Sequence, residues 1–402
     1  MPSAAAPPLR VAFVASQDPR VLANGVNSHS RLLKAALRAV GARIESDVHP
    51  VVSASGRARL FGARALGRLA PDRDRRALRD LETRHAILVA ALRADHGARR
   101  AEVVHAQDFV AAAACLDALG ADCPPLVLAH HANGLAAQEL ASRLHLGDGA
   151  ESVRWCARES ARALARAARV VAVSPWAAEV LRREAAVPEE RLAVVPNGVA
   201  VPPSAPDDGG RQSGRVLAVG QLVERKGLDI LVRAMAAIAA SGRAGGGEVR
   251  ALVLGDGPES SNLQAEARRL RAPVEFPGAA SPAEVAAEMR LASVFALPSR
   301  AENLPMALLE AMAAGLPCVA SDVGSVAQAL QPEGEPPCGL VVPPGDEQAL
   351  GDALWRLMAA PDEARALGRR AYERARAAYG TEAMARRWLD VYRDAIAGRG
   401  AS

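Results

Sequence analysis

The strongest constraint on the fold is a pattern that runs through both halves of the chain: a short apolar strand, a polar loop, then a helix. In the first half, strand signals lie at residues 9–16, 103–108 and 125–131, and a helical pattern runs from about Ser30 to Val40. In the second half, the pattern restarts with strands such as residues 215–220 and 294–299. Strands that alternate with helices form parallel sheets with helices on both faces. We therefore predict an α/β protein with doubly wound parallel sheets.

A segment rich in proline, glycine and small polar residues separates the two halves. It reads AVPPSAPDDGGRQSG and has the composition of a linker. A chain of 402 residues is also too long for one ordinary core, so two domains are expected. We predict an N-terminal domain over residues 1–200, a linker over 201–213 and a C-terminal domain over 214–380. The last helix, residues 381–402, is expected to pack back on the N-terminal domain.

The composition excludes several classes of protein. Half of the residues are apolar and 23% are charged, which indicates a globular chain and not a disordered one. No apolar run reaches the length of a membrane span, and the N-terminus MPSAAAPPLR lacks the apolar core of a signal peptide. The five cysteines are an odd number and lack metal-ligand spacing. These features predict a reduced, cytoplasmic protein.

Basic residues are concentrated between Gly56 and Ala101, where twelve arginines stand among five acidic residues. Because acidic residues are interspersed, a solvated pair of helices is the favoured interpretation. The alternative is a peripheral contact of residues 57–100 with anionic lipid at the inner face of the membrane. No aromatic residues interleave with the arginines as in a nucleic-acid groove, so no nucleic-acid partner is expected. Asp72 and Asp74 form a D-x-D, which we discount as a metal clamp inside this charged helical stretch.

A phosphate site is predicted in the loop VGQLVERKG (219–227), which follows a strand and precedes a helix. Arg225 and Lys226 place positive charge at the positive end of a helix dipole. Lys226 is one of only two lysines among 49 basic residues, which sets it apart in an arginine-biased chain. The turn GDGPE, which starts at Gly255, is a second glycine turn between strand and helix. Neither a dinucleotide-binding glycine fingerprint nor a P-loop is present.

Two glutamates eight residues apart flank a predicted helix that Pro305 opens and Gly315 closes. A diphosphate at the basic loop would repel both carboxylates, so they should contact neutral groups instead. A carboxylate accepts two hydrogen bonds well from a vicinal diol. We therefore assign Glu310 to a ribose and Glu302 to a transferred sugar. The alternative is that both are solvated surface residues.

Taken together, these segments resemble the retaining glycosyltransferases of family 4. The resemblance implies the GT-B fold, in which two Rossmann-like domains face each other across a cleft. It spans nearly the whole chain, and no single motif carries it alone. The motifs are VVHAQD, AVSPWAAEVL, VVPNGV, VGQLVERKGLDILV, LVLGDGPE and the E-x7-E of ENLPMALLEAMAAGLPCVASDVGSV.

The resemblance also implies roles for individual donor-binding residues. Lys226 would bind the diphosphate of the donor, Glu302 its sugar and Glu310 its ribose. The backbone amides of Asn303 and Leu304 would contact the sugar and the phosphates. 

The chain departs from the family pattern at two places in the donor site. Many members have arginine where this chain has Gln221, so that phosphate contact is lost or moves to Arg225. The N-terminal glycine pair of the family is here Asn24-Gly25, which leaves Gly25 as the match for the phosphate-facing loop. Gly255 is expected to line the nucleotide site with its backbone.

Histidines at the ends of N-terminal strands are the candidates for catalysis. The family places a histidine close to the anomeric carbon, and the segment AHH offers His130 and His131. Counting from the proline that opens this strand favours His131, whose imidazole or neighbouring carbonyls would assist removal of the acceptor proton. The usual H-x-H of the preceding strand is here His105-Ala106-Gln107, so His105 is a further candidate.

These inferences predict a retaining hexosyltransferase that uses a UDP- or GDP-sugar without a metal or other cofactor. Its acceptor would be a small molecule, a lipid-linked group or a glycan. Three alternatives remain: a nucleotide-sugar 2-epimerase of the same fold, a non-catalytic nucleotide-sugar-binding partner, and an NAD-dependent oxidoreductase. The missing glycine fingerprint opposes the last of these.

Overall fold

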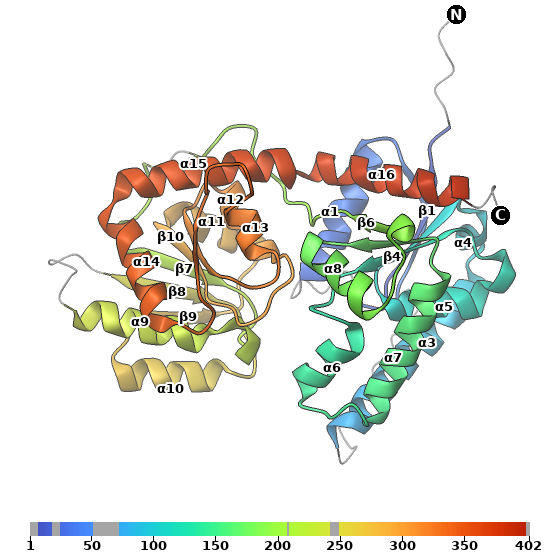
Figure 1. The fold of residues 1–402 in the computed structure, drawn as a ribbon, viewed down its shortest axis with the longest axis horizontal. Coiled ribbons are helices and arrows are strands. Elements are labelled where there is room, and N and C mark those ends of the chain that lie inside the picture. Colours follow the sequence, from blue (N-terminus) through green and yellow to red (C-terminus); the bar gives the residue numbers. More distant parts are fainter. Residues whose placement is uncertain (1–6, 18–24, 51–71, 207–208, 242–248, 399–402) are drawn as a thin grey trace, which may run out of the picture. The chain divides into compact units, whose positions relative to one another are not determined.

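The computed structural model describes residues 7–17, 25–50, 72–206, 209–241 and 249–398 (Figure 1). The chain divides into two compact units. Unit 1 comprises Met1–Pro196 and Met384–Ser402, and unit 2 comprises Asn197–Ala383. The division assigns the proline-rich segment to unit 2, whereas the sequence predicts a separate linker over 201–213.

Unit 1 is built on a six-stranded parallel sheet in the order β2-β1-β3-β4-β5-β6. The strand order reverses between β1 and β3. The polar segments that follow these two neighbouring strands therefore meet at the carboxyl ends of the strands. The strands are β1 (Arg10–Val14), β2 (Arg43–Val48), β3 (Val103–Ala106), β4 (Leu126–His130), β5 (Arg169–Ala172) and β6 (Leu192–Val194). The helices are α1 (Gly25–Ala39), α3 (Arg73–Ala94), α4 (His96–Arg100), α5 (Phe109–Leu119), α6 (Ala136–Leu144), α7 (Glu151–Arg166), α8 (Pro175–Glu184) and α16 (Thr381–Gly398), with 3₁₀ turns η1 (Gly120–Asp122) and η2 (Glu189–Arg191).

Unit 2 has a second six-stranded parallel sheet, in the order β12-β11-β10-β7-β8-β9. Here the order reverses between β7 and β10. The strands are β7 (Arg215–Val219), β8 (Arg250–Leu254), β9 (Val274–Gly278), β10 (Val294–Leu297), β11 (Cys318–Ser321) and β12 (Leu340–Val342). The helices are α9 (Leu228–Ala240), α10 (Ser260–Leu270), α11 (Pro282–Leu291), α12 (Met306–Ala313), α13 (Val326–Leu330), α14 (Glu347–Ala359) and α15 (Pro361–Ala378), with the 3₁₀ turn η3 (Glu224–Lys226).

The prediction of two doubly wound parallel sheets is confirmed, and some element boundaries are corrected. The first helix begins at Gly25 and not near Ser30. β2 and β12 form the edges of their sheets and were not predicted. Pro305 lies in extended backbone as the N-cap of α12, so it precedes the helix instead of opening it.

The last helix, α16, packs on unit 1 although it is distant from that unit in sequence. Its buried face includes Trp388 and Tyr392, which have no exposed surface. They join the apolar cluster formed by residues of β1, β3 and α1, such as Phe13 and Leu33. Helix α16 is therefore part of the core beneath the unit 1 sheet.

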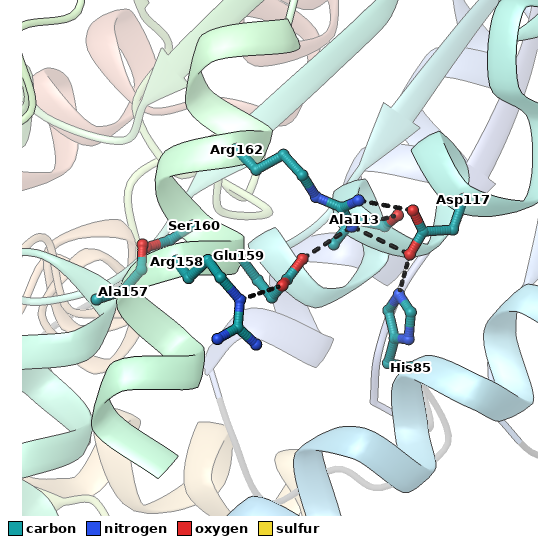
Figure 2. Close-up of polar contacts among 8 residues, drawn as sticks. All are labelled: His85, Ala113, Asp117, Ala157, Arg158, Glu159, Ser160 and Arg162. Atoms are coloured by element: carbon teal, nitrogen blue, oxygen red, sulfur yellow. Dashed lines mark hydrogen bonds and ion pairs between the residues drawn. The ribbon is translucent and has the colours of Figure 1, made fainter. Parts of the chain in front are cut away.

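Helices α3 and α4 carry the described part of the arginine-rich segment, and α3 packs against α5 and α7. The Asp117 carboxylate on α5 accepts hydrogen bonds of 2.7 and 3.0 Å from Arg162 on α7 and lies 2.9 Å from Nε2 of His85 on α3 (Figure 2). The hydrogen bonds from Arg162 lower the pKa of Asp117. Arg162 also pairs with Glu159 at 2.8 Å. Polar contacts thus connect all three helices.

The D-x-D of this segment is used for helix capping. Asp72 accepts a hydrogen bond of 2.7 Å from the backbone N–H of Arg75 at the start of α3. Asp74 accepts hydrogen bonds of 2.8 Å from the backbone N–H groups of Glu151 and Ser152 at the start of α7. Arginines 57, 59, 64 and 68 lie outside the described residues. Of the helices that the structure describes, none is long and apolar enough to cross a membrane.

Candidate functional site

The site in unit 2 lies where the strand order reverses, at the carboxyl ends of β7 and β10. The loop after β7 carries Arg225 and Lys226, and the loop after β10 carries Ser299 and Glu302. Because neighbouring loops at such a point diverge to opposite faces of the sheet, they leave room for a ligand there. The residues that the sequence singled out in two distant motifs are therefore brought to one place.

An ion-pair cluster joins these two loops directly. Nζ of Lys226 lies 2.5 Å from one carboxylate oxygen of Glu302, and Nη1 of Arg225 lies 3.3 Å from the other. The hydroxyl of Ser299, which is fully buried, donates a hydrogen bond of 2.8 Å to Glu302. The Glu302 side chain is only 6% exposed, and a carboxylate that is buried to this extent needs partners that compensate its charge. The two cations and the Ser299 hydroxyl are these partners. Two cations face one anion, which leaves net positive charge at this point.

The loop that carries Lys226 is clamped to the loop after β10 by further contacts. Arg300 binds the Asp229 carboxylate with two hydrogen bonds of 2.7 Å. Gly227, with φ of +59°, connects η3 to α9, and a Cβ at this position would stand 2.0 Å from the carbonyl oxygen of Pro298. Only glycine permits this approach of the two backbones. Lys226 is therefore held at the N-terminus of α9, where the helix dipole favours an anionic ligand.

The second glycine turn packs against the same loop. Gly255 has φ of +150°, and a Cβ there would lie 1.8 Å from the carbonyl oxygen of Gly220. The backbone N–H of Leu222 donates a hydrogen bond of 3.0 Å to Asp256. Gln221 is exposed between these contacts. The GDGPE turn thus supports the basic loop by backbone contact.

The segment that follows Glu302 is held by its carbonyl groups. The carbonyl of Leu304 accepts a hydrogen bond of 2.9 Å from the side-chain amide of Asn197, and that of Asn303 accepts one of 3.0 Å from the backbone N–H of Ser325. Both Asn303 and Leu304 are buried. These contacts fix the backbone whose amides the sequence assigns to the donor.

Glu310 differs from Glu302 in its surroundings. It lies on α12, partly buried among apolar residues, and its carboxylate has no hydrogen-bond or ion-pair partner among the residues that the structure describes. Burial raises its pKa from 4.5 to about 7. Desolvation destabilises the ionised form of such a carboxylate. A ligand that donates hydrogen bonds to it would stabilise this form.

The histidine candidates all lie in unit 1. His130 is buried, and its Nε2–H donates a hydrogen bond of 2.9 Å to the carbonyl of Gly134. His131 follows β4 and is half-buried, with Nε2 at 2.7 Å from the side-chain nitrogen of Gln107. His105 is fully buried between aromatic rings and reaches the other end of Gln107. Gly25, at the start of α1, completes the candidates in this unit.

Four residues that hydrogen-bond to the site candidates were not assigned from the sequence. Ser299 donates a hydrogen bond to Glu302 and stands two residues after the end of β10, where a serine is a weak signal. Asn197 lies in the VVPNGV motif, which was recognised without a role for its asparagine. Gln107 and Tyr392 extend the hydrogen bonding of the histidines, and their partners could not be known before the fold. No group of three or more metal-ligating side chains occurs among the described residues.

The raised pKa of Glu310 predicts a pH-dependent effect of Glu310→Gln on stability. Because the folded protein holds this proton more tightly than the unfolded chain, ionised Glu310 destabilises the fold as pH rises from about 4.5 to about 7. The glutamine variant should therefore be more stable than the wild type at about pH 8, by roughly 1–3 kcal/mol after allowance for partial exposure, and not at about pH 4. Urea unfolding of both proteins at these two pH values measures the difference. An equal difference at both would contradict the buried, unpaired carboxylate.

Comparisons with known proteins agree with this geometry. Residues 23–201 match the model of Glycosyltransferase Family 4, and residues 213–360 match that of Glycosyl transferases group 1. The phosphatidyl-myo-inositol mannosyltransferase of Mycobacterium leprae is 38% identical over 170 residues, which are 41% of this chain and 43% of the relative. The D-inositol 3-phosphate glycosyltransferase of Segniliparus rotundus is 32% identical over 286 residues, 67% of this chain and 62% of the relative.

The matched parts span about half the length of the curated relatives, whereas solved structures align over nearly the whole chain. Sucrose-phosphate synthase of Thermosynechococcus elongatus has a TM-score of 0.76 at 22% identity, covering 97% of this chain and 100% of that one. HepE of Anabaena, solved with UDP-glucose, has a TM-score of 0.68 at 18% identity, covering 98% and 100%. The chain therefore belongs to the family 4-like glycosyltransferases and has the GT-B fold.

Proposed function

We propose that the chain is a retaining glycosyltransferase that transfers a hexosyl unit from a UDP- or GDP-sugar to an acceptor hydroxyl. The observation that carries the proposal is the cluster of Lys226, Arg225 and Glu302 at the strand-order reversal of unit 2. In this proposal unit 2 binds the donor and unit 1 binds the acceptor. Support for a nucleotide comes from HepE, a structural neighbour solved with UDP and with UDP-glucose.

The diphosphate of the donor is assigned to Lys226 and Arg225. Both are at the N-terminus of α9, so two side-chain cations and the helix dipole act on the same anion. Without a ligand, the Glu302 carboxylate forms an ion pair with the ammonium group of Lys226. When the diphosphate binds, it shares or displaces this partner, and a Glu302 oxygen becomes available to accept a hydrogen bond from the transferred sugar.

Glu310 is assigned to the ribose. An unpaired carboxylate with a raised pKa has both oxygens available, and the two ribose hydroxyls can donate to them. Because these hydrogen bonds stabilise the ionised form, nucleotide binding should lower the pKa of Glu310. Ribose binding then recovers part of the free energy that burial of this group costs.

The proposed route has no covalent nucleophile. Glu302, the carboxylate assigned to the sugar, is bound to Lys226, Arg225 and Ser299, and these contacts stabilise its charge and reduce its nucleophilicity. Retention would then follow from attack on the same face that the diphosphate leaves. The negative charge that develops on the diphosphate is stabilised by Lys226 and Arg225, so we propose that no metal ion is required.

The acceptor is proposed only as a class: a small molecule, a lipid-linked group or a glycan. Support for the first two comes from relatives named as a phosphatidyl-myo-inositol mannosyltransferase and a D-inositol 3-phosphate glycosyltransferase. A peripheral contact with the cytoplasmic face of a membrane, through the arginines of residues 57–100, is part of the same proposal. Nothing in the relatives above favours 2-epimerisation.

The two glutamates should fail differently when they are replaced. Glu310→Ala removes hydrogen bonds that a bare nucleotide also makes, so its affinity for UDP or GDP should fall more than tenfold, by about 1.5–3 kcal/mol. Glu302→Ala frees Lys226, so its affinity for the bare nucleotide should be equal to or higher than that of the wild type, while kcat with the donor falls. Calorimetric titration and acceptor-dependent donor turnover measure the two effects.

Equal nucleotide affinities in the two variants would refute this division of roles. The matched control is Glu335→Ala, because Glu335 is an exposed residue of unit 2 that pairs with Arg374. It should change neither quantity. Donor turnover by the wild type without an acceptor, with exchange of the C2 proton, would instead indicate an epimerase.

Chelation tests the proposed metal independence. Activity should be unchanged after dialysis against EDTA, because side-chain cations stabilise the leaving diphosphate. Full loss of activity, with recovery on addition of Mg²⁺ or Mn²⁺, would contradict this assignment. Asp72→Asn and Asp74→Asn would then be the first variants to examine, although both side chains cap helices.

A further inference from the structure

A continuous chain of hydrogen bonds runs through unit 1 from α16 to the end of β4. The hydroxyl of Tyr392 lies 2.8 Å from Nδ1 of His105, and Nε2 of His105 lies 2.8 Å from the side-chain oxygen of Gln107. The side-chain nitrogen of Gln107 lies 2.7 Å from Nε2 of His131. These hydrogen bonds thus connect α16 to His131, the histidine that the sequence favours as a catalytic residue.

The inner part of this chain is held rigidly. The His105 ring stacks on Phe13 with ring centres 4.2 Å apart, and the tilted ring of Trp388 lies with its centre 4.5 Å away. His105 has no exposed surface, and Gln107 is 2% exposed. The backbone N–H of Gln107 also donates to Val14 at 2.8 Å. Buried polar side chains that are packed in this way keep one set of partners.

The donor and acceptor roles along the chain follow from the chemistry of the carboxamide. The oxygen of Gln107 can only accept, so Nε2 of His105 must carry a proton. The nitrogen of Gln107 can only donate, so Nε2 of His131 must present its lone pair. A neutral His131 therefore carries its proton on Nδ1. Nδ1 has no hydrogen-bond partner among the described residues.

The surroundings of His131 keep the ring neutral. Burial lowers its pKa well below 6.5, and His29 and His130 lower it further. His29 on α1 packs edge-on against His131 with ring centres 4.9 Å apart. The pKa of His105, at the other end of Gln107, is lowered to about 3 by burial. The titratable groups that act on His131 are thus His29 and His130, with His105 beyond Gln107, and no acidic side chain contacts His131 in the described residues.

We propose that Gln107 is a positioning residue that holds His131 as the Nδ1–H tautomer, so that His131 donates a hydrogen bond to the bound substrate and does not act as a base. This inference rests on the proposed function for the identity of the substrate. One ring nitrogen of His131 is occupied by Gln107 and the other is protonated. His131 therefore has no free lone pair that could take the proton of the acceptor.

The reaction must then deliver that proton elsewhere. As the bond between the anomeric carbon and the diphosphate oxygen breaks, the acceptor oxygen forms the new bond to the same carbon. The proton of the acceptor hydroxyl passes to the departing diphosphate oxygen, which balances the charge that develops there. His131 contributes a hydrogen bond from Nδ1 to a substrate oxygen and keeps its own proton throughout.

Histidine NMR tests the tautomer without any substrate. In protein labelled with ¹⁵N-histidine, the ring nitrogens of His131, assigned by comparison with His131→Asn, should show a protonated Nδ1 and an unprotonated Nε2 near neutral pH. Protonation at Nε2, or at both nitrogens, would overturn the proposal. Because this measurement uses the wild type, it does not depend on the folding of a variant.

Two substitutions of Gln107 test whether this residue determines the tautomer of His131. A carboxylate accepts at both ends, so Gln107→Glu should move the His131 proton to Nε2. Gln107→Leu, of similar size, should remove the tautomer preference and lower kcat about tenfold with KM little changed. An unchanged tautomer in both folded variants would refute the role of Gln107.

The pH profile provides a readout that a merely structural residue would not alter. Gln107→Glu should add a limb to the pH dependence of kcat, because the carboxylate stabilises the charged form of His131. The wild type should lack this limb.

If the wild type has the Nδ1–H tautomer but transfers no sugar, the proposed function fails and the positioning role stands. If it transfers sugar with the Nε2–H tautomer, the positioning role fails.

Discussion

The ion pair between Lys226 and Glu302 joins the two loops that flank the strand-order reversal of unit 2. The two residues are 76 positions apart in the chain, and a parallel sheet brings them together because β7 and β10 are neighbours. Removal of Glu302 would leave the Lys226 charge largely buried and uncompensated, whereas removal of Lys226 would leave Glu302 with Arg225 and Ser299 as partners. The orientation of Glu302 depends on this contact, while the Arg300–Asp229 pair and the close backbone approach at Gly227 also hold the basic loop in place.

Under the proposed function, the same ion pair would let the site bind an anion and a neutral sugar in close proximity. Without a donor, Glu302 compensates part of the positive charge, which limits the free-energy cost of partly buried cations. With a donor, the diphosphate can take over this compensation and release Glu302 toward the sugar. Glu310 complements this arrangement, because its unpaired carboxylate remains available for hydroxyl donors.

The sequence was sufficient for the fold class and singled out Lys226, Glu302 and Glu310 as site candidates, for definable reasons. Alternating strands and helices specify a doubly wound sheet, and the E-x7-E spacing follows from one loop and one helix that are continuous in sequence. The contact of Lys226 with Glu302 could not be derived in this way, because it depends on which strands are neighbours. The start of α1 was misplaced because Gly25, Asn27 and Ser28 are poor helix formers that read as loop.

The unit 1 histidines show the same limit. Strand-end positions identified His105, His130 and His131 as candidates, but sequence alone could not distinguish the core residue from the half-buried one. Tyr392, 287 positions from His105, is the partner that places His105 in the core. Such a partner lies on a separate element, and only the packing of α16 against the sheet shows it.

The measurement that tests the account most directly is a thermal-shift comparison of the wild type with its two lysine variants. A nucleoside diphosphate at a hundred times its dissociation constant should add about 2.7 kcal/mol to the stability of the wild type. Lys226→Ala should lose most of this shift, whereas Lys34→Ala, which removes the other lysine and its 2.6 Å pair with Asp47 in unit 1, should retain it even if its own Tm is lower. A shift with UDP or GDP that depends on Lys226 is the expected result. No shift with either nucleotide, or an equal shift in the Lys226 variant, would contradict it.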